Sequence, residues 1–449
     1  MSNIPWVQMP GLPSALRARF RIGAGDEDGD DEIIYLIAPS GHPNYGDELI
    51  ALAWLQYLAR TRPHALVVLD CHSPGQTSLL LRGVHPGAVF VDTLWQLAEY
   101  AADTTRTDGP DPTTPWTWVA QAATTFGPAP RLAEGVDVFR RASSVHLLGG
   151  GYVNQVWPHH VSLVAAIAEL TRMTGVPAYA TGQGLIPLLD EPAWSVLTDA
   201  IGVFTVFDVR DEASAQALSG IGARRHTGDD AWLAVGEGDG IDTVSDVDGT
   251  DSVSDVAGAT RRPRHPEGVT LCLQSDLTDD FVAFGSTGLD ALTRFIRATL
   301  DAWQVPAEAI TVVEGIPGGD LEVPTRLGDR LDGATTVPFI DVWRKGLTVG
   351  RGDAWISTRF HPHLVAAAAG DPGVAVVTRP DYYATKHESL VAVGSRWTVV
   401  TGAETIPDRP TAGGFPEDAR DRAVALKKAL AQRIYPRRGR RSGDLRPRR

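Results

Sequence analysis

Short runs of consecutive apolar residues alternate with helical patterns along most of this chain, and this alternation constrains the fold more than any other feature. The first unit is IIYLIAP at 33–39, a polar turn, and LIALAWLQYLAR at 49–60, whose apolar residues recur at helical spacing. The strand signal returns at 65–70, 145–151 and 177–184. Continuous apolar strands that alternate with helices are typical of a parallel sheet covered on both faces.

A stretch almost without large apolar side chains divides this pattern. Residues 236–268 contain the near-repeat DTVSDVDG and DSVSDVAG and cannot bury a core, so we expect a linker or a mobile insert there. Beyond it, apolar runs at 269–274, 309–315 and 374–378 indicate a second α/β unit, with a polar turn region after 315. We predict two α/β domains that face each other across a cleft, with ligands at the loops that follow the strands.

The same patterns set the predicted boundaries. These are a flexible leader 1–32, a first domain 33–235 with a Thr- and Pro-rich insert 102–130, the linker 236–268, a second domain 269–405, a closing amphipathic helix 415–435 and a basic tail 437–449. The tail carries seven arginines and one aspartate. We expect a disordered arm that is either solvated or in contact with an anionic membrane surface.

Composition and charge exclude several classes of protein. The formal net charge is −14 although the tail is basic, which argues against a general nucleic-acid binder because phosphate backbones need broad basic faces. No apolar stretch approaches the ~20 residues that span a bilayer, and the N-terminus has no export signal. We therefore expect a cytoplasmic protein, with peripheral contact at the inner face of the membrane as an option for the tail. Cys71 and Cys272 are expected to be reduced, buried thiols.

Two strand-end loops in the first domain are rich in polar residues or glycine. Asn44, Gly46 and Asp47 lie between a strand and a helix, where backbone N–H groups and the helix N-terminus can hold an anion or a substrate hydroxyl. Asp47 is equally well explained as a helix N-cap. The run Gly149-Gly150-Gly151 permits close approach of the backbone, but it is not a GxGxxG motif.

Two further loops carry arginines. Arg210 stands at the turn into a helix, where it either clamps a carboxylate or phosphate or pairs with Asp208 or Asp211. Arg359 and His361 are two residues apart in a segment that we expect to be extended. Their side chains would then point to the same side, which places a fixed cation beside a titratable imidazole.

Other polar and aromatic residues give weaker signals. His159 and His160 follow Trp157-Pro158, and we expect them at a surface helix start. The sequence has no HExxH motif, no CxxC pair and no Asp-rich metal loop, so it does not indicate a bound metal. Walker A and G-x-S-x-G motifs are absent too. Trp116 and Trp118 either stack on sugar rings or pack back onto their own domain.

Taken in order, these loops resemble the polysaccharide pyruvyl transferase family. The resembling segments are APSGHPNYGDELIALAWLQYL (38–58), HLLGGGYVNQ (146–155), PAYATGQGLIPL (177–188), VRDEASAQAL (209–218), HTGDDAWLA (226–234) and ISTRFHPHLVAAAAGDP (356–372). The resemblance implies two Rossmann-like domains in a GT-B-like arrangement with a central cleft, and no required metal or cofactor. It also implies transfer of pyruvate from phosphoenolpyruvate to sugar hydroxyls of a polysaccharide or lipid-linked glycan, which forms a cyclic ketal.

The resemblance also implies roles for the loop residues. Arg210 and Arg359 grip phosphoenolpyruvate from opposite domains, and His361 is the leading general acid or base. His363 lies two residues away and is the alternative proton carrier. Asp47 orients or deprotonates the acceptor hydroxyl. The predicted substrate-binding set comprises Asn44, Gly46, Gly149, Gly150, Gly151, Gln183 and His363.

Two alternatives remain open at the level of sequence. A GT-B glycosyltransferase would use a nucleotide sugar in the same cleft, although no base-binding signature is visible. A non-catalytic glycan-binding or assembly subunit would use the basic tail as a tether, although the polar loop residues are all retained. The sequence identifies neither the acceptor sugar nor the oligomeric state.

Overall fold

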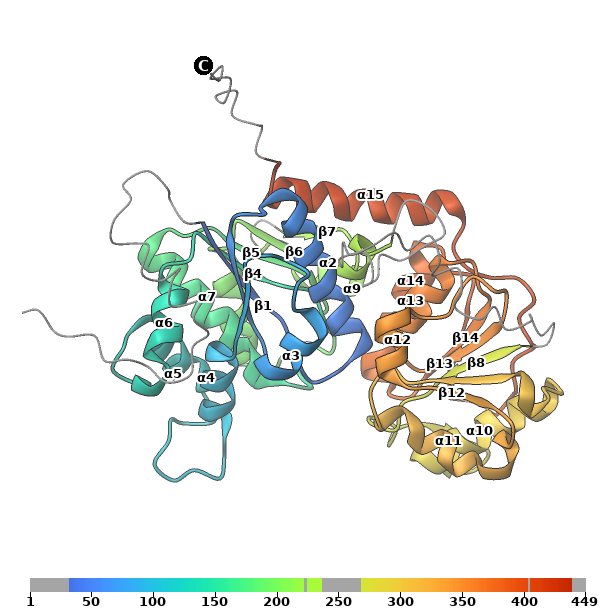
Figure 1. Cartoon of the computed structure of the whole chain (residues 1–449). Helices are drawn as coiled ribbons and strands as arrows, with labels where there is room; N and C mark the ends of the chain where they lie inside the picture. The colour runs from blue at the N-terminus through green and yellow to red at the C-terminus, as the bar shows by residue number, and fades with distance from the viewer. Residues whose placement is uncertain (1–31, 222–223, 236–267, 403, 438–449) are drawn as a thin grey trace, which may run out of the picture.

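The computed structural model of the chain describes residues 32–221, 224–235, 268–402 and 404–437. Two parallel sheets form two α/β halves, which Figure 1 shows side by side in blue to green and in yellow to orange. The predicted leader, linker and tail fall outside the described residues, apart from Glu32, Gly268 and Arg437 at their ends. Among the described helices, none is long and apolar enough to cross a membrane.

Seven parallel strands build the N-terminal sheet in the order β3-β2-β1-β4-β5-β6-β7. They are β1 (Ile33–Ile37), β2 (Leu66–Asp70), β3 (Ala88–Val91), β4 (Ser144–Leu147), β5 (Ala178–Gln183), β6 (Val206–Val209) and β7 (Arg224–His226). The helices are α2 (Tyr45–Thr61), α3 (Pro74–Leu81), α4 (Thr93–Ala102), α5 (Pro115–Thr124), α6 (Ala133–Arg140), α7 (Val161–Thr174), α8 (Ala193–Ile201) and α9 (Glu212–Ala217). This strand order is that of a Rossmann fold, with its switch point between β1 and β4.

The C-terminal sheet repeats the plan with six parallel strands in the order β12-β11-β8-β13-β14-β15. They are β8 (Val269–Cys272), β11 (Ile310–Val313), β12 (Thr335–Val337), β13 (Ala354–Ser357), β14 (Gly373–Val377) and β15 (Thr398–Thr401), and β9 (Val282–Ala283) and β10 (Ser286–Thr287) form a small separate pair. The helices are α10 (Gly288–Ala302), α11 (Glu322–Leu327), α12 (Phe339–Lys345), α13 (Phe360–Ala368), α14 (Thr385–Val393) and α15 (Glu417–Ile434). Counted from β8, the strand order is again that of a Rossmann fold, so the predicted fold class of two Rossmann-like domains is confirmed.

Two expectations about local structure were wrong. The region after residue 315, predicted as polar turns, contains α11, β12 and α12. The segment around Arg359 and His361 is not extended, because α13 begins at Phe360. Pro362 lies in the first turn of that helix, where its missing N–H costs no helical hydrogen bond, so the proline does not prevent the helix from starting there.

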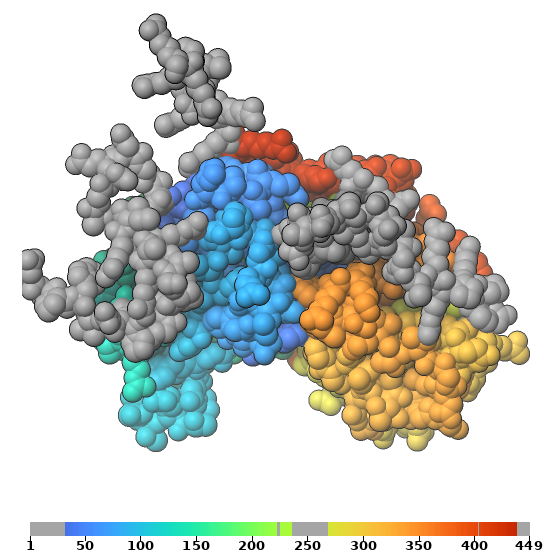
Figure 2. Space-filling view, viewed as in Figure 1, coloured from blue at the N-terminus to red at the C-terminus, as the bar shows by residue number. Residues whose placement is uncertain are grey.

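A continuous apolar core joins the two halves. It includes Trp54 and Leu58 of α2, Leu364 and Val365 of α13, and Ile434 at the end of α15, all with at most 5% of their surface exposed. Because side chains from both sheets share this core, the halves meet over a dry contact and not only through loops. The space-filling view in Figure 2 shows the blue and orange bodies in direct contact.

Helix α15 follows the C-terminal sheet in the chain but runs back across the N-terminal half, as Figure 1 shows in red. Its Lys427 is fully buried and donates hydrogen bonds of 2.9 Å to Asp208 and to Asp230. These carboxylates raise the pKa of Lys427, although burial alone would lower it. The helix therefore attaches the end of the described chain to the N-terminal sheet.

The predictions for cysteine and tryptophan can be checked directly. Cys71 and Cys272 are free, buried thiols, as expected. Trp116 and Trp118 are partly buried against the N-terminal core, and Trp118 lies 5.3 Å from Tyr100 between ring centroids. Both tryptophans therefore pack on their own domain, and helix α5, which carries them, lies inside the predicted insert.

Candidate active site

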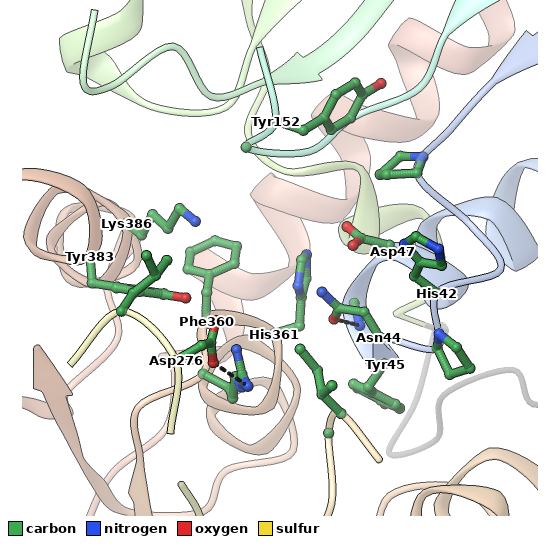
Figure 3. A pocket seen from close by; sticks show the side chains of 18 of the residues that line it. His42, Asn44, Tyr45, Asp47, Tyr152, Asp276, Phe360, His361, Tyr383 and Lys386 are labelled. Carbon is green, nitrogen blue, oxygen red and sulfur yellow. Dashed lines mark hydrogen bonds and ion pairs between the residues drawn. The ribbon is translucent and has the colours of Figure 1, made fainter. Parts of the chain in front are cut away.

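A cavity of about 570 Å³ lies between the two halves at the carboxyl ends of both sheets. Loops that follow β1, β4 and β6 line one side, and loops that follow β8, β11 and β13 line the other. Figure 3 shows these side chains converging, with His361 of the C-terminal half next to Asp47 of the N-terminal half. The central cleft of the predicted GT-B-like arrangement is thus present.

Arg210 lies directly after β6, on the N-terminal side of the cavity, and only 5% of its surface is exposed. Its guanidinium is 3.7 Å from Asp211 and 3.7 Å from Asp229, too far for hydrogen bonds. Its Nε has no hydrogen-bond partner among the described residues. The guanidinium also stacks 5.0 Å from the ring centre of Phe360. Arg210 is therefore a desolvated cation whose hydrogen-bonding capacity is not used up.

Glycines make room for this arginine. A Cβ on Gly151 would lie 2.7 Å from Nη2 of Arg210, and a Cβ on Gly184 would lie 2.5 Å from its Nε. Both distances are shorter than a Cβ tolerates, so a side chain at either position would displace the guanidinium. The third glycine of the predicted loop thus helps to set the position of Arg210.

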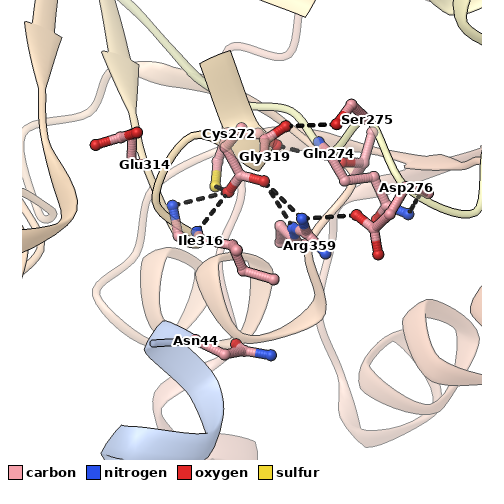
Figure 4. Close-up of polar contacts among 12 residues, drawn as sticks. Asn44, Cys272, Gln274, Ser275, Asp276, Glu314, Ile316, Gly319 and Arg359 are labelled. Carbon is pink, nitrogen blue, oxygen red and sulfur yellow. Dashed lines mark hydrogen bonds and ion pairs between the residues drawn. The ribbon is translucent and has the colours of Figure 1, made fainter. Parts of the chain in front are cut away.

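Arg359 caps the start of α13 on the opposite side of the cavity, and Figure 4 shows the contacts around it. Oδ1 of Asp320 accepts hydrogen bonds from its Nε at 3.0 Å and from its Nη2 at 2.6 Å. Asp276 accepts a further bond from Nη2 at 2.8 Å. Asp320 is itself fixed, because its Oδ2 accepts from the backbone N–H groups of Gly315 and Ile316. Arg359 is an anchored cation that is held by its own domain.

His361 occupies the first turn of α13 and reaches across the cleft. Its Nε2 lies 3.4 Å from Oδ1 of Asp229, a buried carboxylate of the N-terminal half. Burial would raise the pKa of Asp229, but His361 and Arg210 outweigh it and hold that pKa at about 2. Asp229 is therefore ionised at neutral pH and lies beside the imidazole, whose Nε2 has no hydrogen-bond partner among the described residues. An imidazole beside a fixed carboxylate can hold a proton and deliver it into the cavity.

Asp47 faces His361 from the first turn of α2. The N-cap of that helix is Asn44, whose side chain accepts from the N–H of Gly46 at 3.1 Å, so the capping explanation for Asp47 was wrong. Burial raises the pKa of Asp47 to about 6, although His361 and Lys386 counteract the rise. A carboxylate with a pKa in this range can accept a proton near neutral pH.

Gly46 lets the two halves approach at this point. A Cβ on Gly46 would overlap the imidazole ring of His361. The backbone N–H of the neighbouring Tyr45 donates to the carbonyl oxygen of Gly315 in the C-terminal half at 2.8 Å. The predicted Asn44, Gly46, Asp47 loop and the predicted Arg359, His361 loop therefore meet across the cleft.

Lys386, in α14, is a cavity residue that no sequence pattern indicated. It is buried, with 7% of its surface exposed, and its Nζ lies 3.3 Å from the ring centre of Tyr382. Burial and the neighbouring Arg210 lower its pKa well below the usual value. Lys386 adds a third basic group to the cavity, which also contains Arg210 and Arg359.

Four of the predicted residues do not line the cavity. The N–H of Gly149 donates to Asp230 at 2.9 Å, and Gly150 adopts a φ of +153° beside Tyr152. Gln183 donates to the carbonyl oxygen of Leu148 at 2.8 Å behind the cleft.

His363 is the fourth of these residues and is fully buried. Its ring nitrogens contact His387 at 3.0 Å and Ser395 at 2.8 Å. With both nitrogens engaged away from the cavity, His363 is a poor candidate for the proton carrier, and His361 is the better one.

The histidines predicted at a surface helix start are placed differently. They lie in a 3₁₀ helix, Pro158–His160, and His160 is buried against Trp95, with 5.1 Å between ring centroids. His160 also lines the cavity on the N-terminal side, together with His42 and His72. The surface expectation for His160 was wrong because the short helix packs against α4.

The acidic partners of the site were not predicted from the sequence. Asp229 lies in the HTGDDAWLA segment, which carries part of the family resemblance, but no role was predicted for that residue. Asp276 and Asp320 follow β8 and β11, so a search for polar residues at every strand end would have included them. Lys386 belongs to no recognisable motif, and only the packing of α14 beside the cleft places it in the cavity.

Comparison with known proteins supports the resemblance in one half of the chain. The model of the polysaccharide pyruvyl transferase family matches residues 44–258, which confirms the resemblance over that range. The matched range includes Asp47, Arg210 and Asp229, whereas Arg359 and His361 lie beyond it. No curated protein matches the chain.

Solved structures of similar overall plan are only distantly related. A UDP-GlcNAc 2-epimerase from Neisseria meningitidis bound to UDP-GlcNAc has 10% sequence identity and a TM-score of 0.47, with 90% of this chain and 91% of that chain covered. A sucrose-phosphate synthase from Thermosynechococcus elongatus has 13% identity and a TM-score of 0.48, with 90% and 97% covered. The calicheamicin glycosyltransferase CalG4 has 16% identity and a TM-score of 0.45, with 92% and 100% covered. The fold assignment therefore depends on the strand order and the cleft described above.

Proposed function

We propose that this protein transfers the pyruvyl group of phosphoenolpyruvate to sugar hydroxyls of a polysaccharide or lipid-linked glycan and forms a cyclic ketal. One observation carries the proposal: Arg210, Lys386 and Arg359 converge on one cavity that also contains His361 and Asp47. Phosphoenolpyruvate bears a carboxylate and a phosphate, and a basic, desolvated cleft suits such a small anion. The family match over residues 44–258 supports the same reaction.

The proposed reaction has three steps. First, the methylene carbon of phosphoenolpyruvate gains a proton, and a sugar hydroxyl oxygen bonds to the adjacent carbon and loses its proton. Second, the bond between that carbon and the phosphate oxygen breaks, and phosphate leaves with the electron pair. Third, a second hydroxyl of the same sugar bonds to the carbon, and its proton goes to the released phosphate. The sum is phosphoenolpyruvate plus a diol giving a ketal plus phosphate, and it needs no oxidant or reductant.

The residues of the cavity can divide this work. His361, whose Nε2 lies 3.4 Å from the ionised Asp229, is suited to deliver the proton to the methylene carbon. Asp47, with its pKa raised to about 6, is suited to accept the proton of the attacking hydroxyl. Arg210 has hydrogen-bonding capacity to spare and is the stronger candidate for a bidentate contact with phosphate or carboxylate.

A direct test uses the glycan of cells from which the gene has been deleted. Purified full-length protein is incubated with that glycan and phosphoenolpyruvate, phosphate release is followed, and the glycan is analysed by mass spectrometry. We expect phosphate release only when the glycan is present, together with gain of a pyruvyl ketal. His361→Ala should abolish both signals, whereas His64→Ala, at an exposed position outside the cavity, should leave them unchanged. Full activity of His361→Ala would overturn the proposal.

The nucleotide-sugar alternative is separated by ligand binding. A ligand that binds only the folded protein, at a concentration of about 100 times its dissociation constant, raises the free energy of unfolding by about 2.7 kcal/mol. We expect phosphoenolpyruvate to raise the melting temperature, and a panel of nucleotide sugars to leave it unchanged. The opposite pattern would favour a glycosyltransferase, and glycan binding without either response would favour a non-catalytic subunit.

A further inference from the structure

A second group of polar side chains gathers at the N-terminal wall of the cleft, outside the proposed reaction centre. Glu99 comes from α4, and His159 and His160 come from the 3₁₀ helix Pro158–His160. Oε1 of Glu99 lies 3.4 Å from Nε2 of His159 and 3.7 Å from Nε2 of His160. One ligand atom from each of the three residues lies within 4.8 Å of the other two.

These separations fit a metal ion. Zinc binds imidazole nitrogen and carboxylate oxygen at about 2.0–2.2 Å in tetrahedral geometry, which places neighbouring ligand atoms about 3.4 Å apart. Two of the distances are already at or near this value. Closure of the group around an ion would require only small side-chain movements.

The orientation of His160 supports the same inference. Its Nδ1 lies 2.8 Å from the carbonyl oxygen of Tyr152, the residue seen at the top of Figure 3. A carbonyl oxygen can only accept, so Nδ1 carries a hydrogen, and in the neutral ring Nε2, which lies 3.7 Å from Glu99, has its lone pair available for a metal ion. Histidines that bind metals usually donate their other ring N–H to a carbonyl or carboxylate in this way. The ring is further held by Trp95 and Trp157.

We propose that Glu99, His159 and His160 bind one divalent transition-metal ion of the zinc class. Two imidazoles and one carboxylate favour such an ion over Mg²⁺ or Ca²⁺, which prefer oxygen ligands alone. About half of the Glu99 side chain is exposed, at 53%, so a remaining coordination position is open to water or to a hydroxyl. Because His160 also lines the cleft, the ion would lie at the border of the proposed substrate cavity.

The proposal departs from the expectation drawn from the sequence. No metal motif was visible, because the ligands come from two segments about sixty residues apart and only the packing of the 3₁₀ helix against α4 joins them. The inference does not depend on the proposed transferase activity, since metal binding can be measured without any substrate.

The test is a titration of metal-free, full-length protein with Zn²⁺ by calorimetry and with Co²⁺ by visible absorption. We expect one bound ion per chain and a visible absorption spectrum that indicates a low coordination number for the bound Co²⁺. Loss of outer-shell partners alone costs about 10–100-fold in affinity, so Glu99→Gln and His159→Ala should each weaken binding by about 100-fold or more. Both side chains are at least partly exposed, so the variants should fold, and thermal melting verifies this.

A matched control comes from a second histidine–carboxylate pair. His226 lies 3.4 Å from Glu212, neither residue belongs to the Glu99 group, and no third ligand joins the pair among the described residues. His226→Ala should therefore leave the stoichiometry and affinity unchanged. Absence of stoichiometric binding in the wild type would overturn the proposal, as would equal binding in Glu99→Gln, and Glu99 would then serve only as an ion-pair partner of the histidines.

Discussion

The two arginines that face each other across the cleft differ in how they are held. Arg359 makes three hydrogen bonds to carboxylates of its own domain, and its main partner, Asp320, is fully buried. Arg210 approaches its carboxylates only to 3.7 Å, and its Nε has no hydrogen-bond partner in the described part of the chain. Both are buried and both line the cavity. We infer that Arg359 shapes the site and that Arg210 is ready to bind an incoming anion.

Arg210 and Arg359 were both predicted to bind the donor, but their different contacts indicate different roles. A ligand gains less binding free energy from a buried guanidinium that already makes hydrogen bonds, because it must displace the existing partners. It gains more from a buried guanidinium whose donors are unpaired. An unsatisfied buried donor is costly in the free protein, and a bound carboxylate or phosphate would remove that cost. The comparison therefore assigns structural and binding roles that can be measured separately.

We expect the greatest change in the free energy of unfolding from a variant that removes the anchored arginine, Arg359. Arg359→Ala leaves Asp320 buried without its partner, and removal of one member of a buried ion pair costs about 3–5 kcal/mol. Denaturant unfolding followed by circular dichroism measures the loss. Asp276→Asn is the matched control, because Asp276 is 53% exposed and exposed pairs contribute at most about 1 kcal/mol. Equal stability of Arg359→Ala and wild type would show that Arg359 is not an anchor.

A smaller change is expected in the pH dependence of kcat/KM, and it concerns Asp47. The pKa of Asp47 is raised to about 6 by burial, so this carboxylate loses its charge as the pH falls below that value. If the charged form accepts the proton of the sugar hydroxyl, kcat/KM should fall about tenfold between pH 7 and pH 5. The measurement is a pH–rate profile of phosphate release. Asp47→Asn should lower the rate at pH 7 and remove this acidic limb, whereas an unchanged limb in the variant would exclude Asp47 as its source.

Much of the fold was predictable because parallel sheets of this kind leave a strong local signal. The apolar runs at 33–39 and 374–378 correspond to β1 and β14, and both strands are buried along their length. The strands and helices between Gly315 and Ala354 were missed because they are short or only partly buried. In β12, for example, none of the three residues is fully buried, so the apolar signal is weak.

The loops that form the site could be predicted from the sequence, but the side chains that contact each predicted residue could not. The carboxyl ends of β1 and β6 lie at one edge of the N-terminal sheet, and the loop after β13 of the other sheet faces them across the cleft. Asp47, Arg210 and His361 could therefore be selected from their positions after these strands. The pairing of Arg359 with Asp320 depends on tertiary packing between loops that follow different strands. The grouping of Glu99 with two histidines likewise has no local signature.

The most direct test of the account is calorimetric binding of phosphoenolpyruvate to wild type, Arg210→Ala and Arg210→Lys. Truncation of a buried charged partner costs about 2–5 kcal/mol of binding, so we predict one site in the wild type and at least about 30-fold weaker binding in Arg210→Ala. Arg210→Lys should recover only part of the affinity, because lysine keeps the charge but loses the planar fork. Wild-type affinity in Arg210→Ala, with the fold intact, would contradict the account.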